Sequence, residues 1–520
     1  MVDSGTNLGD QEKIGKNKTP IRVILFLVFL FILGIRIFYS FQAEGFSDDD
    51  SYFILRQVES IRESGFPVYE DSLSFGGRSN IFSPVYHYIL AFFSFFMPVW
   101  GVGKIIPQIF AASSVFFVYL VSREVSGSRR ISLFIAAASS FVPVFFMTTL
   151  NTVSPYALVF PLIFFMLFCF LKIGEPRTKK KNMTYAYVFI IGSVFFSLFH
   201  PSFFVFIVGI GTYLVLAWLD KIKIYSGEVE TVIFAAILSV WANLIIYKKA
   251  LIRDGLMIIW RNLPVQVLND YFSQISFGML IYYVGIIPLF FGVYVVYKTI
   301  LKERSKKLYV LFGFALSVGL ILVLKIFPVK EGLSLIGLLL VVFFGVFIKW
   351  FVRYISLTRF SGFKSVILGI IVSLFIVFSI VPSLSLASET IDKSSGQNEI
   401  EALKWVKENT PESSVVFAPF EYGHMVSFVS ERRNIADSNF LMINDGNTRL
   451  DDIKTMYSTK IETKALSVLQ NYEASFVLVN RKILDLFKTD SASYFDGDCF
   501  DKVYSGGFDV YMVKCEVGDS

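Results

Sequence analysis

Residues 21–56 read IRVILFLVFLFILGIRIFYSFQAEGFSDDDSYFILR, an apolar run that is followed shortly by three consecutive aspartates. The apolar part, up to Phe41, is long enough to cross the ~30 Å hydrocarbon core of a bilayer as one helix. The polar residues 1–20 carry neither the apolar core nor the small-residue cleavage site of a signal peptide, so we expect a cytoplasmic tail and a retained helix. The aspartates, Asp48 to Asp50, then lie just beyond a membrane exit.

Apolar runs of similar length recur along the chain. It has 520 residues, of which 54% are hydrophobic and 17% aromatic, and its mean hydropathy is +0.61. Soluble domains are far less apolar, so this composition indicates a membrane protein with several spans. The predicted spans cover residues 21–41, 104–121, 131–149, 156–171, 184–199, 202–219, 231–247, 275–297, 308–326, 333–351 and 364–382.

The apolar stretch 81–100 is left over, and its placement decides the topology. Loops rich in Lys and Arg stay on the cytoplasmic side of a membrane. If 81–100 does not span, the basic loops share a side with the N-terminal tail; if it spans, nearly all of them fall outside. We therefore predict a polytopic α-helical protein of the cell membrane with about eleven transmembrane helices. The stretch 81–100 is then a surface-lying or re-entrant helix.

Three polar segments share the outer side of the membrane in this topology. They are an acidic loop over 42–103, a loop over 248–274 and a soluble domain over 388–520, whereas the N-terminus is cytoplasmic and the transmembrane domain covers 21–387. The formal charge of +6 has its excess in the inner loops, so it does not indicate a nucleic-acid partner.

The soluble domain alternates between helical and strand patterns, which predicts a small α/β layer. The expected helices cover 400–409, 451–457 and 463–472, and the expected strands cover 414–419 and 475–481. The last element, CFDKVYSGGFDVYMVKC, alternates apolar and polar residues about Gly506 and Gly507, which is typical of a hairpin. Such a hairpin sets Cys499 opposite Cys515, either as a disulfide or as two free thiols.

The aspartates precede a stretch with helical spacing, residues 50–64. Carboxylates are favoured at a helix N-terminus by the helix dipole and the free N–H groups. Asp48 and Asp50 also flank a single residue, and this spacing of hard oxygen ligands suits Mg²⁺ or Mn²⁺ beside a phosphate. The alternative is that the acidic run is only a solvated cap at a membrane exit.

The order of these features resembles the C-type (GT-C) glycosyltransferases, which use sugars linked to polyprenyl phosphates. Within that group the chain is most similar to the catalytic subunit of oligosaccharyltransferase and its archaeal and bacterial relatives. Their first outer loop carries an aspartate followed by a D-P-Y-F-x-Y-R-like run. Counting back from Arg56 matches Asp50 to the metal-binding aspartate and Asp48 to the more variable position two before it.

A second point of resemblance is VVFAPFEYGHMVSFVSERRNIADSNF, residues 415–440. The family has a Trp-Trp-Asp-Tyr-Gly signature, followed about a dozen residues later by an Arg and a Leu-Ala-Asp-Gly-Asn-like run. Residues 419–423 occupy the signature positions, and residues 435–439 occupy the later run. The resemblance covers both ends of the chain.

The chain also departs from the family. Both tryptophans are absent and Glu421 replaces the aspartate, although these three residues recognise the hydroxyl of the Asn-x-Ser/Thr acceptor in the family. The next outer loop, TTLNTVSPY, has no carboxylate where the family has a second acidic motif, and it offers only Asn151 and Thr152. Sequon recognition and a complete metal site therefore do not follow from the resemblance.

The resemblance implies transfer of a sugar or oligosaccharide from a polyprenyl-phosphate or polyprenyl-diphosphate carrier to a protein or glycan acceptor outside the membrane. Asp50 and Asp48 would be the catalytic residues and the ligands of a divalent cation, Mg²⁺ or Mn²⁺. With a metal, Asp50 helps to neutralise the departing phosphate. Without one, it acts as the general base on an acceptor hydroxyl.

A departing phosphate also needs cations near the membrane surface. The candidate phosphate-binding residues are Arg253, Arg261 and Arg36, and each of them can alternatively anchor a helix at the interface. The candidate acceptor-binding residues are Glu421, Tyr422, His424 and His87.

Other functions stay open. The chain could transfer a single sugar to a hydroxyl of a protein, glycan or lipid, or it could be a non-catalytic binder or flippase of lipid-linked sugars. Transporters more often place ionisable residues at the midplane of several spans, whereas these spans are mostly Phe, Leu, Ile and Val. Zinc-ligand spacing, a phosphate-binding glycine loop and a nucleophile elbow are all absent from the sequence.

Overall fold

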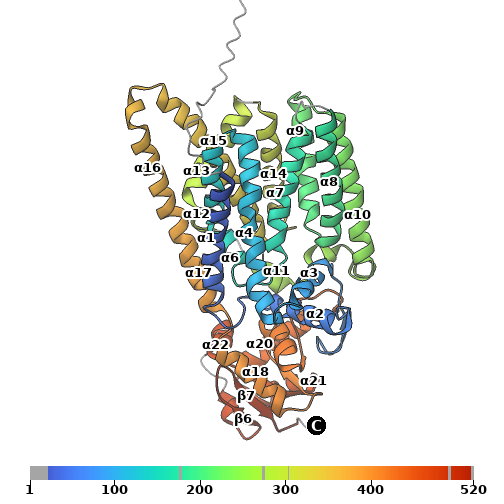
Figure 1. The fold of residues 1–520 in the computed structure, drawn as a ribbon. Helices are drawn as coiled ribbons and strands as arrows, with labels where there is room; N and C mark the ends of the chain where they lie inside the picture. Colours follow the sequence, from blue (N-terminus) through green and yellow to red (C-terminus); the bar gives the residue numbers. More distant parts are fainter. Residues whose placement is uncertain (1–20, 175–178, 272–275, 303, 490–492, 517–520) are drawn as a thin grey trace, which may run out of the picture.

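A bundle of long helices stands on a smaller α/β domain (Figure 1). The computed structural model describes residues 21–174, 179–271, 276–302, 304–489 and 493–516. The chain is thus a polytopic helical protein with a C-terminal α/β domain, as the sequence predicts.

The long helices of the bundle follow the predicted spans. They are α1 (Ile21–Ser40), α4 (Val99–Ser126), α5 (Arg129–Ser139) with α6 (Pro143–Thr149), α7 (Tyr156–Ile173), α8 (Lys179–Phe199), α9 (Phe203–Leu219), α10 (Ser226–Asp254), α12 (Phe277–Val284) with α13 (Ile286–Leu301), α14 (Lys306–Val323), α15 (Val329–Ser356), and α16 (Lys364–Phe375) with α17 (Val381–Lys393). Two shorter pieces, η2 (Arg359–Phe363) and η3 (Ile376–Ile380), precede and join the last two helices.

Most of the predicted spans correspond to membrane-length helices. In the described part of the chain, seven helices are long and apolar enough to cross a membrane, or up to nine if each of two bent pairs is one span. Two shorter apolar helices, Met183–Phe199 and Phe203–Leu219, stand in the bundle beside α10 and α14. They coincide with the predicted spans 184–199 and 202–219 but are shorter than the other spans.

The stretch 81–100 does not form a span. Its helix α3 (Val85–Ser94) has 10 residues and is therefore about 15 Å long, half of what a bilayer needs. One face of α3 is buried, with Tyr86, His87 and Leu90, and the other exposes Tyr88 and Phe92. This pattern agrees with the prediction of a helix that lies in the first outer loop.

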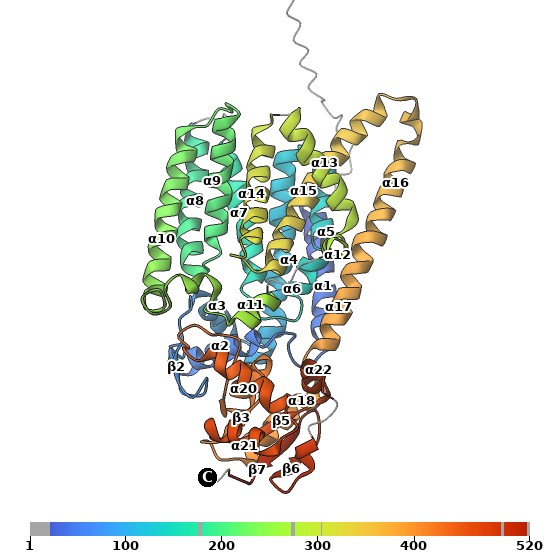
Figure 2. The ribbon, with the colours of Figure 1, turned by 180° about the vertical axis from the view of Figure 1, so that it is seen from behind.

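The rest of that loop contains α2 (Asp50–Ser64) and the two-stranded ribbon of β1 (Glu70–Asp71) and β2 (Arg78–Ser79). Helix α2 begins at the aspartates, as its spacing predicts, and ends at Gly65, whose φ of 82° is the left-handed conformation that closes a helix. A second loop, after α10, contains η1 (Gly255–Trp260) and α11 (Val265–Tyr271). Both loops lie at the end of the bundle that faces the C-terminal domain (Figure 2).

The C-terminal domain contains a mixed five-stranded sheet in the order β4-β3-β5-β7-β6. Strands β3, β4 and β5 are parallel, whereas β5 pairs antiparallel with β7 and β7 with β6. Its elements are α18 (Gln397–Asn409), β3 (Val415–Phe417), η4 (Phe420–Tyr422), α19 (Gly423–Met425), η5 (Val426–Ser430), β4 (Arg433–Asn434), α20 (Gly446–Ser458), α21 (Glu462–Asn471), β5 (Ala474–Val479), α22 (Arg481–Phe487), η6 (Ser493–Asp496), β6 (Phe500–Tyr504) and β7 (Asp509–Val513).

The predicted helices and strands of this domain are all present. The segment that leads into the domain differs from the prediction. Helix α17 continues through residue 388, where the sequence predicts the start of the soluble domain, and ends at Lys393. A helix therefore carries the chain out of the bundle.

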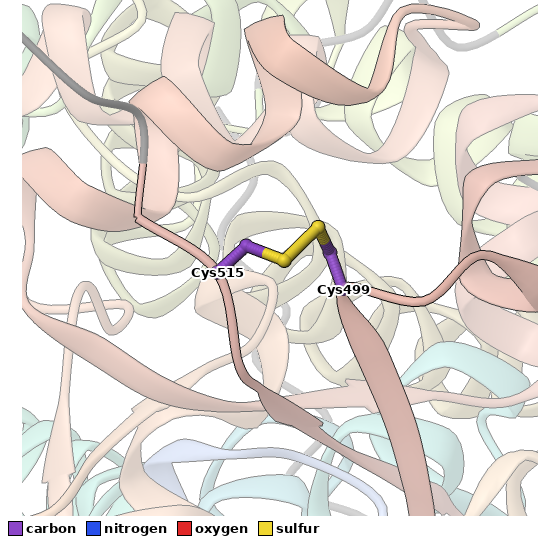
Figure 3. The surroundings of a disulfide bond; sticks show 2 residues. All are labelled: Cys499 and Cys515. Carbon is purple, nitrogen blue, oxygen red and sulfur yellow. A yellow bond between two sulfur atoms is a disulfide. The ribbon is translucent and has the colours of Figure 1, made fainter.

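The predicted hairpin is present as β6 and β7, although its register shifts by one residue between Lys502 and Tyr504. It brings the Cα atoms of Cys499 and Cys515 to 5.0 Å, and the two residues form a disulfide (Figure 3).

The ammonium group of Lys104 joins the bundle to the first outer loop. This buried side chain of α4 donates hydrogen bonds to the backbone carbonyls of Ser40, Ala43 and Gly45, at 2.7–3.0 Å, and to Oδ1 of Asn151, at 2.7 Å. A buried cation is tolerated only where such oxygens replace its water.

Asn151 extends the same network to the C-terminal domain. Its Nδ2 donates to the carbonyl of Gly45 at 3.0 Å and to Oγ of Ser394 at 2.9 Å. The N–H of Gly45 in turn donates to the carbonyl of Ser395 at 2.9 Å. The backbones meet so closely here that a Cβ on Gly45 would lie 2.6 Å from that carbonyl oxygen. The loop that precedes the aspartates is therefore held from both sides.

We expect Lys104→Met to destabilise the protein strongly. The substitution keeps most of the aliphatic volume but removes a donor from three carbonyls and one amide oxygen, of which only the carbonyl of Gly45 and the amide of Asn151 keep another donor among the described residues, and this costs on the order of 3 kcal/mol. A lowered Tm of the purified protein, measured by intrinsic fluorescence, checks this. The matched control is Lys404→Met, at an exposed lysine of α18; an equal loss in both variants would contradict the role given to Lys104.

Candidate active site

The three aspartates lie between the bundle and the C-terminal domain, and their side chains have different partners. Oδ1 of Asp48 accepts a hydrogen bond from the hydroxyl of Ser51 in the first turn of α2. Oδ1 of Asp50 accepts one from the hydroxyl of Ser438 in the C-terminal domain. The two predicted catalytic residues, Asp48 and Asp50, thus lie at the boundary where the loop after α1 meets the C-terminal domain.

The electrostatics of Asp48 are unusual for a carboxylate in a loop. Burial, and after it the negative charge of Asp50, raises the pKa of Asp48 to about 7. A smaller contribution comes from Glu331, in the first turn of α15. Asp48 and Asp50 therefore act on each other directly, and at neutral pH this site can hold or release a proton.

Asp49 makes the most direct contact with the C-terminal domain. Its Oδ2 accepts the N–H of His424 at 2.9 Å, and its Oδ1 accepts the N–H of Met425 at 2.9 Å. These N–H groups belong to the first turn of the helical segment 423–430, formed by α19 and η5. N–H groups in a first helical turn have no partner within the helix, so a carboxylate satisfies them well.

A buried ion pair reinforces the same boundary. Nη2 of Arg78, on β2, donates to Oδ1 of Asp437 at 3.0 Å, and both side chains are buried. The hydroxyl of Ser74 donates to the other oxygen of Asp437. Burial alone would raise the pKa of Asp437, but Arg78 and the hydrogen bonds outweigh it and lower the pKa below the usual range. The D-S-N run of the C-terminal domain thus holds the first outer loop.

Arg56, from which the motif was counted, forms an ion pair inside the loop. Its guanidinium donates to both oxygens of Asp71, at 2.8 and 2.9 Å. Such a bidentate pair fixes α2 against β1. The pair lowers the pKa of Asp71 despite the opposing effect of burial.

Two predicted acceptor-binding residues, His424 and His87, lie in one aromatic cluster. The ring of Phe53 is 5.0 Å from that of His424 and 6.2 Å from that of His87, between ring centroids. Burial lowers the pKa of His424, and it lowers the pKa of His87 to about 4, so both rings are neutral at neutral pH. Nε2 of His424 lies 3.4 Å from Oδ1 of Asp437.

The other two, Glu421 and Tyr422, belong to η4. Both side chains are half-buried, and the Tyr422 ring packs edge-on against Phe508, with centroids 5.3 Å apart. Phe508 precedes β7, so this contact directs Tyr422 toward the sheet. Burial raises the pKa of Tyr422.

The predicted phosphate-binding arginines lie in three different places. Arg261, in the loop after η1, is exposed, and after burial its charge contributes to lowering the pKa of His200 to about 3. Arg253 donates to the carbonyl of Met442 and, at 2.6 Å, to Oδ1 of Asn444. Arg253 therefore ties the end of α10 to the C-terminal domain.

Arg36 is buried in the bundle rather than paired with the acidic loop. Its Nε donates to Oε1 of Gln108 at 3.1 Å, and its Nη2 donates to Oγ1 of Thr149 at 2.7 Å. Its guanidinium also lies 4.9 Å from the ring centroid of Phe146. These contacts join α1, α4 and α6.

Glu331 was missed by the sequence interpretation. It immediately precedes a predicted span, where an acidic residue is easily taken for a cap, and only the fold shows that its charge acts on Asp48.

Asp48 and Asp50 would supply only part of the ligand shell of a divalent cation. No group of three or more His, Cys, Asp or Glu side chains that could hold a metal ion occurs in the described part of the chain. Asp48 and Asp50 do repel each other, and a cation between them would relieve that repulsion. One or two carboxylates are also what Mg²⁺ commonly takes from a protein when a substrate phosphate and water complete its shell.

Comparison with known proteins places the fold. No family model and no curated protein matches the sequence. Among solved structures, the Archaeoglobus fulgidus oligosaccharyltransferase tethered with an acceptor peptide containing the NVT sequon is 15% identical, with a TM-score of 0.65 over 87% of this chain and 69% of that one.

Two further structures are similar. ArnT from Cupriavidus metallidurans bound to undecaprenyl phosphate is 10% identical, with a TM-score of 0.58 over 94% of this chain and 97% of that one. The arabinofuranosyltransferase AftD from Mycobacteria is 12% identical, with a TM-score of 0.56 over 95% of this chain and 40% of that one. The chain thus has the fold of C-type membrane glycosyltransferases, as the resemblance in the sequence predicts. At identities of 10–15%, the likeness concerns the fold and not the sequence.

We expect Asp48→Asn to stabilise the protein at pH 8 and to stabilise it clearly less at pH 5. The folded-state pKa of Asp48, about 7, lies above the unfolded value of about 3.9. Its contribution to stability is therefore fully present below about pH 4 and is lost as the pH rises through about 7. The amide avoids that loss because it carries no charge. Tm values measured in EDTA at both pH values check this; the same shift at pH 5 and pH 8 would contradict it.

Proposed function

We propose that the protein is a glycosyltransferase that moves a sugar or oligosaccharide from a polyprenyl-phosphate or polyprenyl-diphosphate carrier to an acceptor on the outer face of the cell membrane. The observation that supports this most is the pair of half-buried carboxylates, Asp48 and Asp50, at the start of α2 and beneath the bundle. The structures with the same fold were solved with dolichol phosphate, undecaprenyl phosphate or an acceptor peptide. The N-terminus is then cytoplasmic, and the C-terminal domain lies outside.

In this proposal Asp50 and Asp48 carry the chemistry. A divalent cation bound to them would offset the charge of the departing phosphate. The pKa of about 7 also lets Asp48 accept a proton from an acceptor hydroxyl at neutral pH. A pKa near the working pH suits a general base, so this observation favours the alternative in which a single sugar passes to a hydroxyl of a protein, glycan or lipid.

The carrier phosphate needs a cation at the mouth of the site. Arg261 is best placed, because it is exposed at the end of the bundle that faces the C-terminal domain and its charge reaches His200. Arg253 and Arg36 stay candidates as well; Arg253 donates to Asn444, and Arg36 is buried in the bundle, where it donates to Gln108.

Acceptor recognition is proposed for Glu421, Tyr422, His424 and His87. Support comes from the position of Glu421 and Tyr422 within residues 419–423, which resemble the family's acceptor signature, and of His424 directly after them. The aromatic cluster around Phe53 then brings His87 beside His424.

Substitution of Asp50 tests the function directly. Purified protein in liposomes is supplied with labelled polyprenyl-linked sugar and with peptide, glycan or lipid acceptors, with and without EDTA. We expect Asp50→Ala to abolish transfer, because the position loses both its carboxylate and its hydrogen bond to Ser438. Glu44→Ala, at an exposed carboxylate of the same loop, should keep full activity. Transfer retained by Asp50→Ala would contradict the catalytic role of Asp50. Label that crosses the bilayer without transfer to an acceptor would favour a flippase.

Arg261→Ala is expected to lower kcat/KM for the lipid-linked sugar by roughly 10-fold or more. The reason is that an arginine contact with a phosphate is among the stronger polar interactions in proteins. Initial rates over a range of carrier concentrations give this value. Lys404→Ala is the matched control, and unchanged kinetics in Arg261→Ala would exclude a phosphate contact.

A further inference from the structure

Asp49 has no place in the proposed chemistry, yet its side chain is the best-bonded of the three aspartates. Each of its carboxylate oxygens accepts one backbone N–H, from His424 and Met425, at 2.9 Å. A carboxylate whose two oxygens both receive N–H donors is fixed in direction as well as in position. This arrangement suits docking rather than proton transfer.

The site that receives Asp49 cannot shift easily within the C-terminal domain. Gly423, at the start of the helical segment 423–430, packs so tightly that a Cβ there would lie 2.1 Å from the carbonyl oxygen of Ala436. Nδ2 of Asn434 also donates to the carbonyl of Gly423, at 2.8 Å. The helix start is therefore held directly against residues 436–437.

The same segment of the C-terminal domain reaches Asp50. The hydroxyl of Ser438, one residue beyond Asp437, donates to Oδ1 of Asp50. The helix start that binds Asp49 and the run that binds Asp50 are thus in mutual contact. Two neighbouring side chains at the start of α2 dock on one rigid surface.

We propose that Asp49 is a positioning residue, which docks the start of α2 onto the helical segment 423–430 and thereby sets the orientation of Asp48 and Asp50. The C-terminal domain is then part of the catalytic assembly through its backbone, in addition to any acceptor contact. This inference rests on the proposed function, because orientation matters only if the two carboxylates react.

The variant Asp49→Asn tests the inference with little change in size. An amide accepts hydrogen bonds through one oxygen only, and its NH₂ group would face the second N–H. Glu44→Gln is the matched control, because it removes the same charge from an exposed side chain five residues earlier in the loop. Both variants are made in the full chain, and wild type is compared with them in liposomes.

Two readouts are combined. Hydrogen–deuterium exchange of the peptide that contains residues 423–430 should be faster in Asp49→Asn and unchanged in Glu44→Gln. Turnover of Asp49→Asn should fall on the order of 10- to 100-fold, as expected for a small misplacement of reacting groups. Its KM for the lipid-linked sugar should stay within about twofold, because in this proposal the Asp49 side chain docks on the C-terminal domain and does not itself contact the carrier.

The outcomes separate the two proposals. Faster exchange with wild-type turnover, or unchanged exchange, would overturn the positioning role while leaving the glycosyltransferase proposal intact. A loss of turnover together with a raised KM and a lowered Tm would show a merely structural role, and this result would also overturn the positioning role. If wild type transfers no sugar, the proposed function fails, and the inference that rests on it fails with it, even if exchange confirms the docking contact.

Ser438→Ala supplies a second variant that leaves the bonds of Asp49 in place. Because both residues act on the same helix start, the double variant should lose less activity than the product of the two single losses. A fully multiplicative loss would contradict a shared role.

Discussion

The buried ammonium group of Lys104 is the interaction on which the rest of the site depends. Its hydrogen bonds to three loop carbonyls and to Asn151 hold the chain that leaves α1, and Asn151 passes this constraint to Ser394 at the end of α17. The loop is therefore fixed to the bundle and to the C-terminal domain before the aspartates begin. Because the acceptors of Lys104 are neutral, the carboxyl groups of the three aspartates stay available to other partners.

The three aspartates have different roles where the loop after α1 meets the C-terminal domain. Asp49 docks on backbone N–H groups, whereas burial, and after it the charge of Asp50, raises the pKa of Asp48 to about 7. The buried pair of Arg78 and Asp437 gives the C-terminal domain a second hold on the same loop. Removing one member of a buried ion pair is costly, so this contact makes separation of the two parts unfavourable. The stretch 415–440, which carries the second point of resemblance in the sequence, therefore also binds the first outer loop.

The sequence predicted the features that depend on local patterns. Apolar run length gave the spans, charge bias excluded 81–100 as a span, and helical spacing placed the start of α2 at the aspartates. It did not predict contacts between distant parts of the chain. Lys104 was counted as the first residue of a span, and the partners of Asp49 lie 375 and 376 positions away. Glu331 was overlooked for the same reason, because only the packing of α15 brings its charge near Asp48. The pairing of Cys499 and Cys515 was left open, because spacing shows proximity and not oxidation.

The fate of the lipid carrier tests the central claim most directly. Reconstituted wild-type protein is supplied with a polyprenyl-phosphate-linked sugar that carries separate labels on the sugar and the lipid, together with an acceptor mixture. A glycosyltransferase of the proposed kind releases one free carrier phosphate for each sugar that appears on the acceptor. Movement of both labels across the bilayer as one intact molecule, with no free carrier, would contradict the account.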